Sequence, residues 1–223
     1  LCDGGGFRVY VARRPSVRRR LLGLDYVYLC FDVNEETLPA AVAGLKTCGI
    51  RGFNLTMPNK NKIVELLDDL SPEAQLIGAV NTVLNDNGKL IGYNTDGYGF
   101  MQSVRDAGHD ITGKNITVMG VGGASMAICA QSALDGAASV HIFARRTSRY
   151  WNRTQKFAEN LSAKTGCQVC LFDNDDHTAL RDSIAQSYLL INATSVGMVP
   201  DIDDTIIKDT SLFRPGLVVA DVV

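Results

Sequence analysis

Lys60 and Asp96 could together transfer a proton in the oxidation of an alcohol. Such a reaction needs a hydride acceptor and a group that takes the hydroxyl proton. A lysine beside an aspartate can take that proton, because the carboxylate orients the ammonium group and tunes its pKa. Each residue also has a simpler interpretation, Lys60 as a surface lysine in a first helical turn and Asp96 as a helix N-cap. Spacing alone favours the simpler interpretation.

A glycine-rich turn at residues 120–123 could bind the phosphates of a hydride-accepting cofactor. The turn reads Gly-Val-Gly-Gly and lies between a β-branched run and a helical pattern. Gly120 permits a tight turn, and Gly122 lets the backbone approach a pyrophosphate at the helix N-terminus. The third position of the dinucleotide fingerprint holds Ser125 instead of glycine, so an ordinary glycine loop remains an alternative.

The end of the next strand indicates which dinucleotide would bind. NAD-binding units place Asp or Glu about 20 residues beyond the glycines, where it holds the ribose 2′-hydroxyl. Here residues 143–149 read Phe-Ala-Arg-Arg-Thr-Ser-Arg, with three guanidinium groups, two hydroxyls and no carboxylate. Arginine can bind a 2′-phosphate through paired hydrogen bonds. The sequence therefore predicts NADP, and a solvated basic loop is the alternative.

The residues around the glycine turn follow a βαβ pattern. Ile116, Val118 and their neighbours predict a buried parallel strand, residues 124–135 a helix ended by Gly136, and residues 139–143 a second strand. Helices at 151–165 and 178–185 and strands at 168–172, 188–192 and 217–223 continue the alternation. This order is typical of a doubly wound parallel sheet, which binds ligands at the carboxyl ends of its strands.

The first half of the chain places polar residues at the ends of its expected strands. Strands are expected at 26–33 and 50–55, a helix at 37–48, and a helix after Lys60 with the apolar face Ile63, Leu66, Leu67 and Leu70. Asp86-Asn87-Gly88 predicts a hairpin between strands at 80–85 and 89–94, which would set Asn81 opposite Tyr93. A helix capped by Asp96 should run to Ala107 and stop at Gly108.

The composition argues against several classes of protein. The chain has 223 residues, 46% of them hydrophobic, which suffices for one large domain or two small ones. A net charge of −2 argues against nucleic acid as the main partner. No apolar run reaches the roughly 18 residues that span a membrane, and no signal peptide is recognisable. We therefore expect a cytoplasmic protein.

The cysteines and histidines do not predict a metal site. The six cysteines, at positions 2, 30, 48, 129, 167 and 170, are scattered through strand and helix patterns and resemble reduced core residues of a cytosolic protein. Cys167 and Cys170 form a lone CxxC without a second pair. The three histidines at 109, 141 and 177 do not cluster.

Five motifs in order resemble the shikimate dehydrogenase family. They are NLTMPNK at 54–60, LIGAVNTVLND at 76–86, GYNTDGYGF at 92–100, GVGGAS at 120–125 and INATSVGM at 191–198. The wording of MPNK and GGASMAICAQ is closest to the quinate/shikimate dehydrogenase branch. The resemblance covers residues 22–223 and implies NAD(P)-dependent interconversion of shikimate and 3-dehydroshikimate, a step toward aromatic amino acids, with quinate as a further possible substrate. It implies a monomer or homodimer.

The resemblance also implies the fold class and the site residues. The fold is α/β, with an N-terminal α/β substrate domain at 1–108 and a Rossmann-like, doubly wound NAD(P)-binding domain at 109–223. Lys60 and Asp96 would be the catalytic pair, and Thr56, Asn81 and Asp96 would bind the hydroxylated ring. Cofactor contacts would come from Gly120, Gly122, Gly123, Ala124, Arg145, Arg146, Thr194, Ser195 and Met198. The expected cofactor is NADP, with NAD possible.

The sequence departs from the family pattern in three places. An Arg-rich stretch at 11–21, with only Ser16 nearby, replaces a Ser-x-Ser-Pro segment that binds the substrate carboxylate. The family continues past Val223 into helices that supply a substrate-binding glutamine, and the quinate/shikimate branch tends to carry Asp at the position of Thr147. We therefore expect NADP binding with weak or absent turnover of shikimate. The alternatives are a catalytically impaired NADP-binding homologue and a dehydrogenase for another polyol or hydroxy acid.

Overall fold

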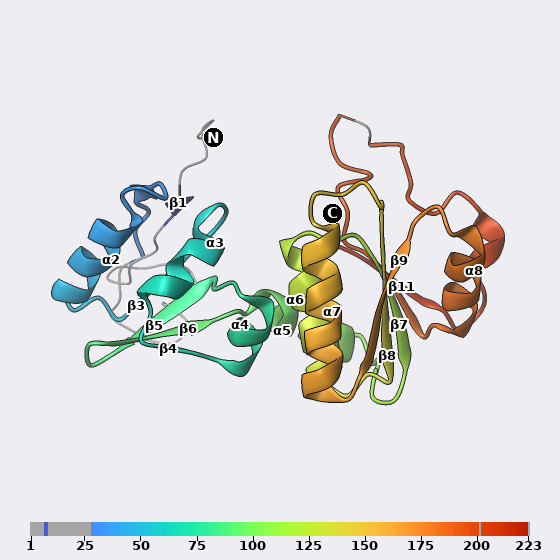
Figure 1. The fold of residues 1–223 in the computed structure, drawn as a ribbon, viewed down its shortest axis with the longest axis horizontal. Coiled ribbons are helices and arrows are strands. Elements are labelled where there is room, and N and C mark those ends of the chain that lie inside the picture. The colour runs from blue at the N-terminus through green and yellow to red at the C-terminus, as the bar shows by residue number, and fades with distance from the viewer. Residues whose placement is uncertain (1–6, 9–27, 201, 223) are drawn as a thin grey trace. The chain divides into compact units, whose positions relative to one another are not determined.

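The computed structural model describes residues 7–8, 28–200 and 202–222. The Arg-rich stretch at 11–21, Ser16, Cys2 and the start of the strand expected at 26–33 lie outside the described residues. The chain folds into two compact units, Leu1–Thr95 and Asp96–Val223. Figure 1 shows the helices and strands of both units.

The first unit contains a four-stranded sheet in the order β3-β5-β6-β4. β3 spans Gly52–Asn54, β4 Asp69–Leu70, β5 Thr82–Asp86 and β6 Lys89–Tyr93, while β1 (Phe7–Arg8) pairs with β2 (Asp32–Val33). The predicted hairpin is confirmed, but its loop has two residues, Asn87 and Gly88, both with positive φ. Thr82 therefore pairs with Tyr93, and the register predicted for Asn81 is wrong by one residue.

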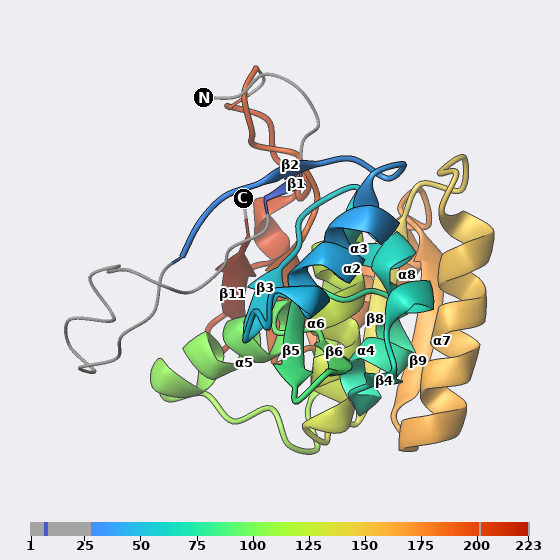
Figure 2. The same cartoon turned by 90° about the vertical axis from the view of Figure 1, so that its left-hand side faces the viewer.

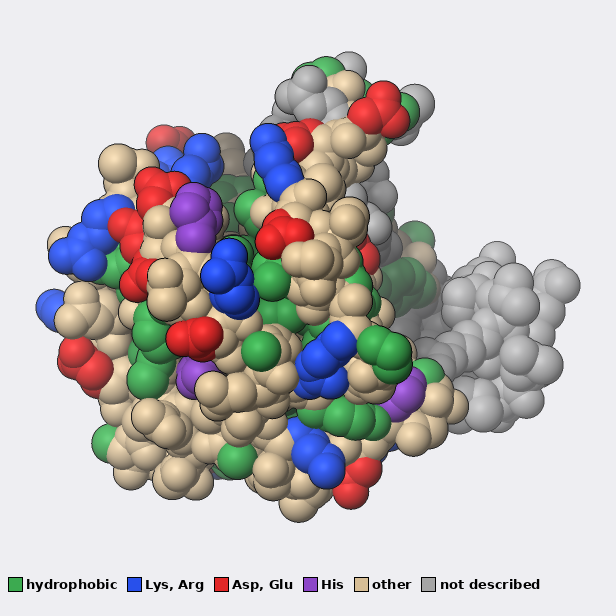
Figure 3. Space-filling model, turned by 90° about the vertical axis from the view of Figure 1, so that its right-hand side faces the viewer, with side chains coloured by type: hydrophobic (Ala, Val, Ile, Leu, Met, Phe, Trp, Pro, Cys, Tyr) green, Lys and Arg blue, Asp and Glu red, His purple; other side chains and the backbone are tan. Residues whose placement is uncertain are grey.

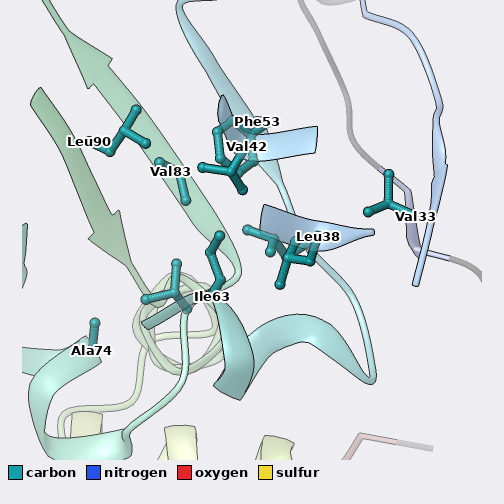
Figure 4. Packing of buried hydrophobic residues seen from close by; sticks show 10 residues of the cluster. Val33, Leu38, Val42, Phe53, Ile63, Ala74, Val83 and Leu90 are labelled. Atoms are coloured by element: carbon teal, nitrogen blue, oxygen red, sulfur yellow. The ribbon is translucent and has the colours of Figure 1, made fainter. Parts of the chain in front are cut away.

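Apolar side chains from the helices and the sheet form the core of this unit. α2 (Leu38–Thr47) and α3 (Asn59–Lys62) lie on the same side of the sheet (Figure 1, Figure 2). Leu38 and Val42, one turn apart on α2, are buried against Phe53 of β3 and Ile63 (Figure 4). The short helix α4 (Pro72–Ile77) begins after Ser71, whose hydroxyl accepts a hydrogen bond from the Ala74 amide.

The helix predicted from Lys60 through Leu70 is wrong beyond its first two turns. α3 gives way to a 3₁₀ turn, η1 (Ile63–Leu66), and the chain is extended from Leu67 into β4, which pairs in parallel with β6. Asp68 donates its amide to the Leu90 carbonyl and accepts the Leu90 amide on its carboxylate. These bonds to β6 outweigh the helical spacing of the leucines, as tertiary pairing often does.

The second unit is a five-stranded parallel sheet in the order β11-β10-β7-β8-β9. The strands are β7 (Asn115–Met119), β8 (Ser139–Ala144), β9 (Gln168–Asp173), β10 (Leu189–Asn192) and β11 (Val218–Asp221). Because the chain first moves outward to β9 and then returns to β10, the order reverses beside β7. Ligands of doubly wound sheets bind at the carboxyl ends of the strands at this reversal.

Helices cover both faces of this sheet. α6 (Gly123–Leu134) and α7 (Trp151–Thr165) lie on one side, and α8 (His177–Gln186) lies on the other (Figure 1). α5 (Asp96–Asp106) packs against α6, where Gly97 leaves no room for a Cβ atom beside the Ala127 carbonyl. Asp96 is the first residue of α5. The loop between β10 and β11 contains the 3₁₀ turn η2 (Thr210–Leu212).

The structure corrects the expectation that the cysteines are core residues. Cys129 and Cys167 are buried, and burial raises the pKa of their thiols to about 12 and about 11. Cys30 and Cys48 are exposed. None of the described helices is long and apolar enough to cross a membrane. On the face of the second unit in Figure 3, acidic and basic side chains are interspersed and form no continuous basic patch.

Candidate active site

A cavity of about 1070 Å³ opens at the carboxyl edge of the parallel sheet in the second unit. Three loops form its walls, those that follow β7, β8 and β10, and a further residue, Asn174, comes from the end of β9. The predicted cofactor residues in its wall are Gly120, Gly122, Arg145, Thr194, Ser195 and Met198. Gly123 and Ala124 do not line the cavity, because they already belong to the first turn of α6.

The glycine turn after β7 is held in a conformation that only glycine adopts easily. Gly120 has a φ of 108°, and its amide donates to the Phe143 carbonyl at the end of β8, 2.8 Å away. Ser125, at the imperfect fingerprint position, is fully buried and donates its hydroxyl to the Gly120 carbonyl at 2.6 Å. This hydrogen bond stabilises the turn, so a serine can occupy the third fingerprint position in place of glycine.

The arginines after β8 differ in their placement. Arg145, Thr147, Ser148 and Arg149 line the cavity. Arg146 does not, since its guanidinium lies over the ring of Trp151, 4.7 Å from the centroid. The stretch from 143 to 149 therefore presents two guanidinium groups and two hydroxyls to the cavity. This wall can bind an anion such as a phosphate ester.

Asn192 and Thr194 order the loop after β10. The Asn192 side-chain oxygen accepts hydrogen bonds from the amide and the hydroxyl of Thr194, at 3.1 and 2.7 Å. The Thr194 oxygen in turn accepts the amide of Val196 at 3.1 Å. Through these bonds the loop keeps Thr194 and Ser195 in the cavity wall, on the opposite side of β7 from the arginines.

In the first unit, polar residues meet where β3 and β6 end and β5 begins. The Lys60 carbonyl accepts the amide of Val80 at 2.7 Å, which ties the start of α3 to the chain beside Asn81. The Asn81 side chain is buried and exchanges hydrogen bonds with Thr95, while the Thr82 hydroxyl donates to its oxygen. Asn54 donates to Thr82 at 2.8 Å. Thr56, which precedes the first turn of α3, is exposed.

The two residues of the predicted catalytic pair belong to different units. Lys60 is half-buried in α3 of the first unit, and Asp96 opens α5 of the second unit. Asp96 directly follows Thr95, whose bonds to Asn81 fix the end of the first unit. The roles of Lys60 and Asp96 stay predictions.

The residues at the carboxyl edge fit a phosphorylated dinucleotide. Gly122 caps α6 and is exposed, and a Cβ atom placed on it would meet nothing within 4 Å. The free amides of the first turn of this 12-residue helix therefore face open space beside two guanidinium groups. Backbone amides suit a pyrophosphate, and the guanidiniums suit a further phosphate.

Comparisons with known proteins agree with this architecture. A family model described as the shikimate dehydrogenase substrate binding domain matches residues 17–83. Shikimate dehydrogenase (NADP(+)) of Listeria innocua is 49% identical over 202 residues, which make up 91% of this chain and 69% of the relative. The chain belongs to the shikimate dehydrogenase family. The resemblance seen in the five motifs is thereby confirmed.

Solved structures of similar proteins share the fold. Shikimate 5-dehydrogenase from Listeria monocytogenes, in complex with shikimate and NAD, matches with a TM-score of 0.89 and 47% identity, over 92% of this chain and 71% of that chain. The 5-ketofructose reductase of a Gluconobacter strain matches with a TM-score of 0.78 and 33% identity, over 91% of this chain and 70% of that chain. The predicted fold class is confirmed.

The cavity of this shikimate dehydrogenase family member also contains residues that the sequence did not suggest. Tyr150, Asn174 and Ile206 line it as well. Arg149 donates a hydrogen bond to the Tyr150 hydroxyl at 2.6 Å and lies over its ring. Asn174 follows β9, a position that parallel strand order could have indicated, because the ends of neighbouring strands share one edge.

Proposed function

We propose that this protein is an NADP-dependent oxidoreductase that interconverts shikimate and 3-dehydroshikimate. The observation that carries the proposal is the stretch after β8, where Arg145, Thr147, Ser148 and Arg149 line the cavity and no carboxylate stands among them. The wall also contains the carboxylate of Asp204, which comes from the loop after β10. Family membership and the relatives named for NADP and shikimate support the proposal. Activity on quinate, a cytoplasmic location and a monomer or homodimer belong to the same proposal.

The cofactor would be held by the second unit. Gly120 and Gly122 would admit the pyrophosphate to the N-terminus of α6, and Arg145 would bind the 2′-phosphate with Arg146 close by in the chain. Thr194, Ser195 and Met198 would lie toward the nicotinamide. When bound, NADP provides a nicotinamide ring that can accept a hydride from the carbon that carries the reacting hydroxyl. The assignment of 109–223 to the cofactor and of 1–108 to the substrate is part of the proposal.

Lys60 and Asp96 would handle the proton. In these proposed roles the Lys60 amine would take the hydroxyl proton during oxidation and return it during reduction, and Asp96 would orient the amine. Thr56 and Asn81 would contribute hydrogen bonds to the hydroxylated ring. The hydrogen bonds that hold Asn81 against Thr95 and Thr82 give it a fixed orientation, which suits a ring-binding residue.

A second candidate is a dehydrogenase for a different polyol, which the likeness to 5-ketofructose reductase favours. One experiment separates the candidates. In three separate reactions, the protein is incubated with NADP and either shikimate, quinate or fructose, and NADPH formation is followed. Binding of NADP is measured in parallel by isothermal titration calorimetry. NADPH from shikimate supports the proposal, NADPH only from another alcohol supports the second candidate, and binding without any turnover supports an impaired homologue.

A further inference from the structure

Asn174 carries a buried amide oxygen that no described residue satisfies. It directly follows β9, and its Oδ1 atom is shielded from solvent without a hydrogen-bond partner in the described part of the chain. Native proteins leave few buried polar atoms unpaired, and such an atom often marks a functional position. Because nothing described holds the oxygen, a rotation of the amide about χ2 would break no hydrogen bond at that atom.

The backbone places Asn174 at the adenosine end of the proposed cofactor site. The backbone N–H of Asn174 donates to the backbone carbonyl of Ala144, 2.9 Å away, and Ala144 directly precedes Arg145. β8 lies between β7 and β9, whereas β10, with the loop proposed for the nicotinamide, lies on the other side of β7. With strands about 4.8 Å apart, a base that continues outward from a ribose at the end of β8 reaches the end of β9.

Asn174 also lies where two cavities adjoin. It lines the large cavity and a second one of about 480 Å³, and Ile206 lines both as well. Ile206 offers apolar surface for one face of a planar ring, and Asn174 offers a donor and an acceptor for its edge. Apolar surface beside a few directed polar groups is typical of a ligand-binding pocket.

We propose that Asn174 reads the adenine base of the bound cofactor. Its amide oxygen accepts a hydrogen bond from the 6-amino group, and its amide nitrogen donates to ring nitrogen N7. Hypoxanthine presents two acceptors at this edge, so a rotated amide does not match it either. The paired donor and acceptor of an asparagine match adenine in this way, as they do in the recognition of DNA. The inference rests on the proposed function, because it requires that NADP binds in the large cavity.

The test compares NADP with its hypoxanthine analogue, in which a carbonyl replaces the 6-amino group. Dissociation constants are measured by isothermal titration calorimetry. We expect the wild type to bind NADP at least about tenfold more tightly than the analogue, since an unmatched hydrogen-bonding group discriminates strongly. Asn174→Leu should bind NADP at least about tenfold more weakly and distinguish the two nucleotides no longer. Asn174→Asp keeps the acceptor and should keep the preference.

Two controls separate a binding role from a structural one. Asp175→Asn changes an exposed neighbour that lines only the second cavity, and it should leave both affinities unchanged. Asn174→Leu should unfold at the same or a higher temperature than the wild type, because it removes an unpaired buried oxygen. Equal binding of the two nucleotides by the wild type, or a preference that survives in Asn174→Leu, overturns the inference. Failure of the wild type to bind NADP at all overturns the proposed function itself.

Discussion

Gly120 and Gly122 should respond differently to the same substitution, although both stand in one glycine turn. A Cβ atom on Gly120 would lie 2.6 Å from the Ala193 oxygen and 2.9 Å from the Ala193 carbonyl carbon. These are backbone atoms at the end of β10, so the strand end itself must move. With a φ of 108°, alanine would also be strained in place. On Gly122 the same methyl group meets nothing within 4 Å, and φ is −78°.

The magnitude for Gly120→Ala follows from three contributions. Backbone strain costs about 1–3 kcal/mol and the forced shift about 1–3 kcal/mol, while the stiffer unfolded chain returns about 0.4–1 kcal/mol. We expect a net loss near 3 kcal/mol, which lowers the unfolding temperature by about 6–12 °C for a chain of this size. Gly122→Ala has only the stiffer unfolded chain and should unfold at the temperature of the wild type or up to about 4 °C above it.

Cofactor affinity supplies the other half of this prediction. Because Gly122 faces open space at the start of α6, its substitution by alanine should weaken NADP binding by about tenfold or more, at about 1.4 kcal/mol per tenfold. The assays are thermal unfolding without nucleotide and calorimetric titration with NADP. Two results would refute the reasoning: unchanged stability of Gly120→Ala, or full NADP affinity in Gly122→Ala.

Three further predictions concern single side chains. The wild type should bind NADP about tenfold or more tightly than NAD, and Arg145→Gln should bring the two dissociation constants near equality. Arg146→Gln should change this preference less, because the Arg146 side chain lies on Trp151. Equal dissociation constants for the two cofactors in the wild type would contradict this. Lys60→Ala should lower turnover by about 100-fold or more with NADP affinity unchanged. Retained activity would mean that Lys60 is a surface lysine without a catalytic role. Burial lowers the pKa of His141 below 6.5 in the folded protein, so the unfolded chain binds the proton more readily. The contribution of neutral His141 to the free energy of unfolding should therefore be fully present above pH 6.5 and decrease as the pH drops below that value. Urea unfolding of the wild type and His141→Gln at pH 7.5 and 5.5, about one unit on either side of that value, checks this, and an equal loss in both proteins would contradict it.

The nucleotide half could be predicted well because its signals are local. Strand, glycine turn, helix and strand from 115 to 144 follow from periodicity and from glycines that end the helices, and the helix at 151–165 has the expected bounds. The helix expected through Leu70 failed because Asp68 and Leu70 bond to β6, a partner distant in sequence. The register of Asn81 failed by one residue because the hairpin loop has two residues and not three.

The site could be predicted only where the type and sequence position of a residue indicate its chemistry. The glycines and Arg145 signal phosphate binding by kind and position, and they line the cavity. Arg146 has the same chemistry, but its stacking on Trp151 depends on how α7 begins, which no spacing reveals. Asn174 carries no motif, and its unpaired oxygen is visible only once β9 lies beside β8.

The most direct test of the proposed function identifies the product as well as the cofactor. The chain is incubated with NADP and an equimolar mixture of shikimate, quinate and fructose, and products are identified by mass spectrometry beside NADPH. We predict that NADPH appears slowly, together with an equal amount of 3-dehydroshikimate, and that both form about 100-fold more slowly or not at all with Lys60→Ala. NADPH formed from another alcohol while shikimate stays unchanged, or bound NADP without any product, would contradict it.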